Sequence, residues 1–177
     1  MDAGQETRRA FIQLAKEDMH FSAAHFTIFS PNERENLHGH DFFVEARAGG
    51  PIDANGLCFD YTLLKDRLRS LCGSLDETLL IAAQSPHLEI HEERDQVVVS
   101  FADETLRFAH RDVKLLPIRN VTVEELAHWF TAALTGDDGF ASLPVETLTV
   151  RLSSGPGQWA ETTWSADAGS TAGGTRP

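Results

Sequence analysis

Residues 37–48 read Leu-His-Gly-His-Asp-Phe-Phe-Val-Glu-Ala-Arg-Ala, and this stretch says most about the fold and the chemistry of the chain. Its run of Phe42, Phe43 and Val44 is typical of a β-strand. On a strand, residues two positions apart face the same side, about 6.5 to 7 Å apart, so His38 and His40 can converge on one ion. Gly39 between them leaves the opposite face free of a side chain.

A third histidine comes from the preceding segment. Residues 9–26 are interpreted as one strand, and a hairpin through the polar loop 30–36 brings His25 opposite the pair. Three imidazoles without a fourth protein ligand are typical of a catalytic zinc site, in which water or substrate takes the open position. His20 is five residues from His25 and is expected to face the other side of the strand.

The remaining pattern predicts two helices and further strands. Leucines at positions 64, 68, 71 and 75 predict an amphipathic helix that begins after Asp60 and ends near Gly73. The capping-box spacing Thr122–Glu125 predicts a second helix that ends before Gly136. Short apolar runs at 88–91, 96–101 and 105–110 predict a β meander. Residues 145–152 are predicted to form the last strand. This order indicates an α+β fold with helices on one face of an antiparallel sheet.

Length and charge limit the class of protein. The 177 residues suit one domain, expected at residues 9–164 between disordered ends at 1–8 and 165–177. The formal charge of −12 argues against a nucleic-acid partner and against binding to anionic membranes. No signal peptide or membrane span is predicted, and two cysteines suit a reducing compartment. We therefore expect a cytoplasmic protein.

Five motifs follow one another between about residues 21 and 164. They are Phe21-Ser-Ala-Ala-His25, Leu37-His-Gly-His40, Gly56-Leu-Cys-Phe-Asp60 with Leu64-Lys65 behind it, Ser74-Leu-Asp76 and Thr122-Val-Glu-Glu-Leu-Ala127. In this combination the chain resembles the 6-pyruvoyl-tetrahydropterin synthase and 6-carboxytetrahydropterin synthase family. The resemblance implies the tunnelling fold (T-fold), a four-stranded antiparallel sheet with two helices. It also implies a homo-oligomeric barrel, commonly a hexamer of two stacked trimers, with sites between subunits. A zinc ion would be held by His25, His38 and His40.

The same resemblance implies lyase chemistry on 7,8-dihydroneopterin triphosphate, with metal-assisted proton transfer by a protein base. The family's usual base is a cysteine before the histidine pair, and this chain has none there. A branch of the family has a glutamate in its place and cleaves the substrate side chain to a 6-hydroxymethyl pterin. Glu33 and Glu35 are the two candidates for that base. Arg34, Lys16 and Arg151 are candidate cations for a triphosphate.

Two further positions depart from the family pattern. Asp76-Glu77 stands where the family has Asp-His, so Glu77 replaces a histidine that relays protons. Ser153 and Ser154 offer hydroxyls where a glutamate normally binds the pterin edge, with Glu161 the next acid. The leading hypothesis is a zinc-dependent lyase in which Asp76 and Glu77 orient groups or relay protons. The alternatives are a repurposed member that catalyses another cyclisation or elimination in specialised metabolism, and a non-catalytic, zinc-stabilised ligand-binding oligomer.

Overall fold

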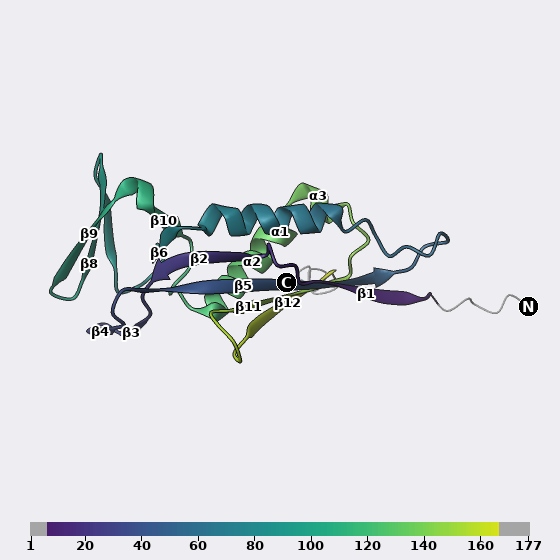
Figure 1. The fold of residues 1–177 in the computed structure, drawn as a ribbon, viewed down its shortest axis with the longest axis horizontal. Coiled ribbons are helices and arrows are strands. Elements are labelled where there is room, and N and C mark those ends of the chain that lie inside the picture. The colour runs from purple at the N-terminus through teal and green to yellow at the C-terminus, as the bar shows by residue number, and fades with distance from the viewer. Residues whose placement is uncertain (1–6, 167–177) are drawn as a thin grey trace, which may run out of the picture.

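A seven-stranded mixed sheet dominates the computed structural model, which describes residues 7–166. Neighbouring strands follow the order β10-β6-β2-β5-β11-β12, and β1 also pairs with β5. Two helices lie along one face of this sheet (Figure 1). The bounds of these elements are β1 Arg9–Leu14, β2 His20–His25, β5 His38–Pro51, α1 Thr62–Leu75, β6 Thr78–Ala82, β10 Val113–Leu116, α2 Val123–Thr135, β11 Thr147–Ser153 and β12 Ala160–Ser165.

Strand β5 organises the sheet because it is long enough to pair with two successive strands. Its first half lies antiparallel to β2, and its second half lies antiparallel to β1. The prediction of one strand over residues 9–26 is therefore wrong. The chain bulges at 15–19, where Met19 N donates to Lys16 O and Val44 N donates to Met19 O. The bulge keeps Leu14 and Met19 both buried beneath the helices.

The predicted antiparallel core is present as the four strands β2, β5, β11 and β12. Strands β6 and β10 widen it with parallel pairings, which the expectation of an antiparallel sheet did not include. Leu80 and Ala82 of β6 belong to the main core, while Leu79 and Ile81 belong to a second apolar cluster. A strand buried on both faces has no polar alternation, and this hides it in the sequence.

The two main helices follow the predicted signals closely. Asp60 accepts a hydrogen bond from Thr62 N, and α1 continues through Gly73 to Leu75, two residues beyond the predicted end. Thr122 caps α2 by accepting from Glu125 N. The Glu125 carboxylate accepts from Arg119 N instead of reaching back to Thr122, so only half of the expected capping box forms. A short helix, α3 (Asp138–Ala141), follows α2.

Two small sheets lie at one end of the molecule (Figure 1). The predicted meander forms from β7 (Glu89–Glu92), β8 (Gln96–Phe101) and β9 (Glu104–Ala109). A hairpin of β3 (Ile28–Ser30) and β4 (Glu33–Arg34) forms the other sheet. The second apolar cluster joins them, because Ile28 of the hairpin and Phe101 of the meander both pack in it.

The ends of the described chain differ slightly from the predicted domain limits. Residues 1–6 and 167–177, which make up most of the predicted disordered ends, lie outside the described residues. Ser165, the first residue of the predicted tail, is the last residue of β12, and Ala166 N donates to Glu146 O. Among the described residues, no helix has the length and apolar character needed to cross a membrane.

Candidate metal centre

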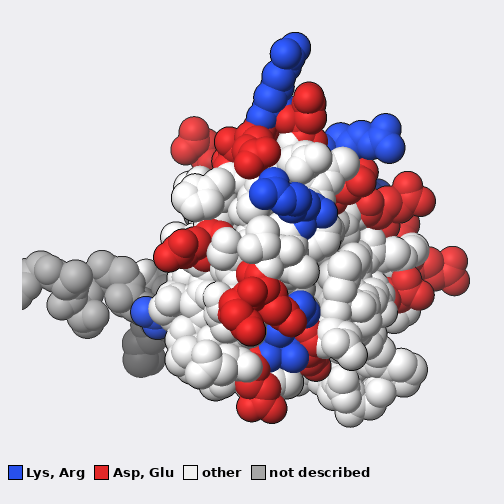
Figure 2. Space-filling model, turned by 90° about the vertical axis from the view of Figure 1, so that its left-hand side faces the viewer, with Lys and Arg blue, Asp and Glu red and all other residues white. Residues whose placement is uncertain are grey.

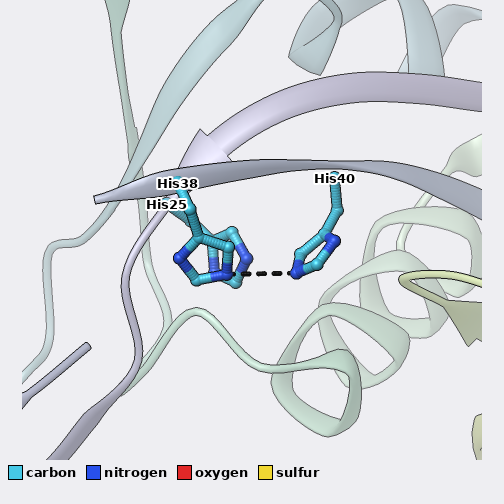
Figure 3. A group of neighbouring side chains, drawn as sticks. All are labelled: His25, His38 and His40. Atoms are coloured by element: carbon cyan, nitrogen blue, oxygen red, sulfur yellow. Dashed lines mark hydrogen bonds between the residues drawn. The ribbon is translucent and has the colours of Figure 1, made fainter. Parts of the chain in front are cut away.

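Three histidines converge at the end of the antiparallel pair β2–β5. His25 lies directly opposite His38 in the strand register, and His40 follows two residues later on β5. The side chains point to the same side of the sheet (Figure 3), and their ring centroids lie 4.6 to 5.3 Å apart. The strand alternation that predicted this arrangement also sends His20 to the exposed face.

Main-chain carbonyls orient two of the rings. His25 Nδ1 donates to Val121 O at 3.1 Å, and His38 Nδ1 donates to Asn36 O at 2.8 Å. A carbonyl oxygen can only accept, so each contact places the proton on Nδ1 and leaves Nε2 with a free lone pair. Such outer contacts normally fix a histidine for metal binding.

The nitrogen atoms fit a tetrahedral metal ion. One ligand atom from each histidine lies within 4.8 Å of the others, and the Nε2 atoms of His38 and His40 are 3.1 Å apart. Two nitrogens bound to tetrahedral zinc at about 2.0–2.1 Å lie about 3.3 Å from each other. His25 Nε2 is buried without a hydrogen-bond partner among the described residues. Buried polar atoms are almost always paired, so this orphan atom supports a ligand between the rings.

The protonation state of His25 also suits a metal ligand. Desolvation by burial, reinforced by the nearby His38, lowers the pKa of His25 to about 4. The ring is therefore neutral at pH 7, which is the form that binds metal ions.

Asn120 holds the loop behind the histidines, and sequence reasoning missed it. Its Oδ1 accepts from Ile28 N and from Val121 N, and its Nδ2 donates to Ile28 O. One side chain thus ties the β3–β4 hairpin to the residue whose carbonyl orients His25. The sequence gives no clear signal for this role beyond a polar residue next to a helix cap.

Of the two candidate glutamates, the structure brings Glu35 to the histidines. Its Oε2 lies 3.9 Å from His38 Nε2 and accepts from Thr27 N at 3.0 Å. Burial opposes ionisation of this carboxyl, but the hydrogen bonds from Thr27 and the nearby His38 outweigh it, so the pKa of Glu35 lies below its usual range. Glu35 is a carboxylate at neutral pH. Glu33 is exposed on β4 beside a different hollow, formed with Phe101, Asp103 and Glu104.

Asp76 and Glu77 lie away from the histidines of their own chain. Asp76 accepts from Ser22 N, and Glu77 N donates to Ser22 O. Glu77 lines an open cavity of about 480 Å³ with Ser22, Asp41 and Asp112. His40 also lines this cavity, but Ser22 and Asp41 alternate with the histidines along their strands, so their side chains point to the face opposite the histidine rings. Glu77 also has a left-handed backbone, with φ of +55°.

Of the two serines proposed to contact substrate, Ser153 is the last residue of β11 and Ser154 begins the turn to β12. Ser153 is fully buried, and its hydroxyl bonds within the turn, donating to Gly155 O and accepting from Gly155 N. Ser154 accepts from the Gln158 side chain at 3.4 Å. Glu161 lies on β12, 3.6 Å from Arg151, which also pairs with Glu45 at 3.2 Å. In one chain none of these groups joins the histidine centre.

Comparison with known proteins identifies the family. The model of the family 6-pyruvoyl tetrahydropterin synthase matches residues 13–164. The chain belongs to this family. Among curated proteins, one from Pyrococcus horikoshii, named as a candidate 6-carboxy-5,6,7,8-tetrahydropterin synthase, is 25% identical over 148 residues, covering 83% of this chain and 87% of the relative. A protein of the same name from Methanocaldococcus jannaschii is 27% identical over 148 residues, covering 80% and 88%.

Solved structures of the 6-pyruvoyl tetrahydropterin synthase family share the fold. The crystal structure of the Plasmodium vivax enzyme superposes with a TM-score of 0.83 at 28% identity, covering 89% of this chain and 99% of that one. Two further structures of that enzyme are variants in which a catalytic glutamate is replaced by alanine or by cysteine. The T-fold expected from the sequence is thereby confirmed, and the protein is a pterin synthase-like member of its family.

Neither cysteine of the chain belongs to this centre, as the sequence indicated. Cys58 and Cys72 are both buried free thiols in the main core. Burial raises the pKa of Cys72 to about 12, so that this thiol stays protonated. Neither cysteine can therefore serve as the base, and the carboxylate of Glu35 is the acidic side chain that lies beside the histidines.

Proposed function

We propose that the protein is a zinc-dependent lyase of the pterin synthase type, with zinc held by His25, His38 and His40 and with Glu35 as the base. One observation carries the proposal. A carboxylate that is ionised at neutral pH lies 3.9 Å from His38 Nε2, and ligand atoms of the three histidines converge within 4.8 Å of one another. The catalytic glutamate of the Plasmodium vivax enzyme supports the same chemistry.

Zinc at this centre would supply Lewis-acid polarisation of a substrate side-chain oxygen. Glu35 would accept a proton from the substrate next to that oxygen, as a general base within hydrogen-bonding reach. The hydrogen bond from Thr27 N fixes one carboxylate oxygen, which leaves the other for the substrate. We propose a dihydroneopterin triphosphate-like substrate and side-chain cleavage as the reaction, since a glutamate stands in the place of the cysteine.

The proposed site is completed by a second subunit. Glu77 lines the cavity with Ser22 and Asp41, and Asp76 accepts from Ser22 N, so we propose that both orient groups or relay protons at a neighbour's centre. The same holds for the substrate contacts proposed for Ser153 and Ser154. We therefore propose a homo-oligomeric barrel, a hexamer or another assembly of trimers.

Metal analysis and product analysis test the proposal together. The purified protein is expected to carry about one zinc per subunit. Incubation with 7,8-dihydroneopterin triphosphate, followed by mass spectrometry, is expected to yield a 6-hydroxymethyl pterin. Release of a 6-pyruvoyl or 6-carboxy product would contradict side-chain cleavage, and protein without zinc after growth in zinc-sufficient medium would contradict the metal centre.

A repurposed reaction is the second candidate, and it rests on one observation. Ser153 and Ser154 offer only hydroxyls where the family has a pterin-binding glutamate, and a lost charge-assisted hydrogen bond costs on the order of 1.5–3 kcal/mol. A zinc-loaded protein that leaves 7,8-dihydroneopterin triphosphate unchanged would support this second candidate. A monomer with no bound ligand would contradict both.

A further inference from the structure

Arg34 is the last residue of β4 and immediately precedes Glu35 in the chain. Its side chain is largely shielded from solvent and makes its contacts away from the three histidines. Its side chain is only 14% exposed. The guanidinium lies 5.1 Å from the ring centroid of Phe26 and 6.0 Å from that of Phe101, within the range of cation–π contacts. A buried, fully charged group needs polar partners as well as these rings.

The polar partners of Arg34 link two parts of the fold. Nε and Nη2 donate to Glu104 Oε2 at 2.8 and 2.5 Å, and Glu104 begins strand β9 of the meander. Nη1 donates to the main-chain oxygen of Glu35 at 2.8 Å. One planar guanidinium therefore connects the meander to the backbone of the proposed base. With its donors used in this way, Arg34 is not a free cation for a triphosphate.

Besides Arg34, the chain around Glu35 is restrained by Thr27 and by His38, whose Nδ1 donates to Asn36 O. Glu35 N donates to Thr27 O at 2.8 Å, and Thr27 N donates to the Glu35 carboxylate. The β3–β4 pairing has only two register positions, Ile28–Arg34 and Ser30–Glu33, and is interrupted between them. The three-stranded meander is the larger of the two small sheets at this end of the molecule. Basic and acidic side chains are interspersed on the surface of this end (Figure 2). The guanidinium of Arg34 thus joins the hairpin to the meander by hydrogen bonds.

We propose that Arg34 is a positioning residue for Glu35, holding its main chain against β9 so that the carboxylate stays beside His38. This inference rests on the proposed function, because it takes Glu35 as the base. Arg34 acts through Glu35 and touches no reacting atom. A displacement of about 1 Å at a reacting group can cost on the order of 100-fold in rate, so a small movement of the hairpin suffices for a large effect.

Arg34→Lys separates positioning from charge. A lysine keeps the positive charge and can still pair with Glu104, but its single ammonium cannot reproduce the planar fork that also reaches Glu35 O. Arg107→Lys is the matched control, since Arg107 pairs with Glu93 at 3.5 Å within the same meander and contacts no part of the hairpin hydrogen-bond network. We expect Arg34→Lys to lower kcat about 10- to 100-fold with KM unchanged and zinc content equal to that of the wild type. Arg107→Lys should leave all three unchanged.

A double-mutant cycle shows through which residue Arg34 acts. In a Glu35→Gln background, Arg34→Lys should cause no further loss of kcat, because the group that it positions no longer accepts a proton. Fully multiplicative losses in the cycle would overturn the proposal.

Amide hydrogen exchange provides a readout that needs no turnover. We expect Arg34→Lys to speed exchange at the amides of Thr27 and Glu35, and Arg107→Lys to leave both at the wild-type rate. If the wild type does not convert 7,8-dihydroneopterin triphosphate, the proposed function fails. The exchange comparison still shows whether Arg34 holds the main chain of Glu35 in place. Unchanged exchange in Arg34→Lys would overturn the positioning role even in an active enzyme.

Discussion

Glu35 Oε2 lies 3.9 Å from His38 Nε2, and a main-chain hydrogen bond from Thr27 to the same oxygen holds it there. The two residues are three positions apart in a segment that leaves the β3–β4 hairpin and enters β5. This short path places the proposed base beside the proposed metal ligands. The succession of β2, the β3–β4 hairpin and β5 along the chain therefore brings Glu35 and the three histidines together.

Replacing Glu35 tests the base assignment that the sequence left open. Glu35→Gln keeps the size and an oxygen for Thr27 N but cannot take up a proton, so kcat should fall about 10²- to 10⁴-fold. Glu33→Gln, two residues away on the exposed strand β4, is the control and should leave kcat unchanged. Steady-state kinetics on both variants, with zinc measured in each, checks the prediction. Equal activity of the two variants would remove Glu35 from the mechanism.

Removing one histidine tests the metal centre. His40→Ala deletes one of three nitrogens, and since outer-shell changes alone cost about 10- to 100-fold in metal affinity, the loss of a ligand should cost more. His20→Ala removes a histidine on the exposed side of β2, where its ring contacts Glu17 O and Phe43. Competition with a chromophoric zinc chelator measures both affinities. Similar affinities for His40→Ala and the wild type would contradict the three-histidine site.

The sequence predicted the histidine centre because strand periodicity alone places His38 and His40 on one face and His20 on the other. It also predicted α2 and the meander, whose caps and turns are local. It missed β6, because Leu79 and Leu80 face two different apolar clusters and leave no alternation. The choice between Glu33 and Glu35 stayed open because it depends on how the hairpin folds back onto Thr27. Asn120 was missed because two of its three hydrogen bonds are to the main chain of Ile28, which is distant in sequence.

The metal-free protein should lose stability as pH falls from about 6.5 to about 4. His25 has a pKa of about 4 in the folded state and 6.5 as its ordinary value, so the unfolded chain binds more protons within that window. Protonation then favours unfolding, with a total loss on the order of 3 kcal/mol that is complete below pH 4. Urea unfolding at pH 7 and pH 5 measures this effect above the range in which carboxylates titrate. His25→Gln should show a flatter profile, and the same slope in that variant would contradict the assignment.

Asn120 should stabilise the fold and the metal centre together. Asn120→Ala removes three hydrogen bonds, at about 0.5–1.5 kcal/mol each, so we expect a loss of about 2–3 kcal/mol. Zinc affinity should fall as well, by up to about tenfold, because Val121 O would no longer be held against His25. Asn120→Asp keeps the oxygen that accepts from Ile28 N and Val121 N. Its stability and zinc affinity should lie between those of the wild type and those of Asn120→Ala. Denaturant unfolding and zinc titration check both effects, and full zinc affinity in Asn120→Ala would contradict the link to His25.

Glu77 combines a strained backbone with a proposed role at a neighbouring site, and one substitution separates the two. A left-handed conformation costs a non-glycine residue about 1–2 kcal/mol, and glycine loses part of this gain to chain entropy, so Glu77→Gly should stabilise the fold by about 0.5–1 kcal/mol. Ala102, with φ of +50° in the turn between β8 and β9, gives the matched control Ala102→Gly with a similar gain. If Glu77 relays protons for a neighbouring subunit, Glu77→Gly will be more stable and less active, whereas Ala102→Gly will be more stable and equally active. Thermal unfolding and kinetics on the two variants measure both properties, and full activity in Glu77→Gly would show that the residue only closes the end of α1.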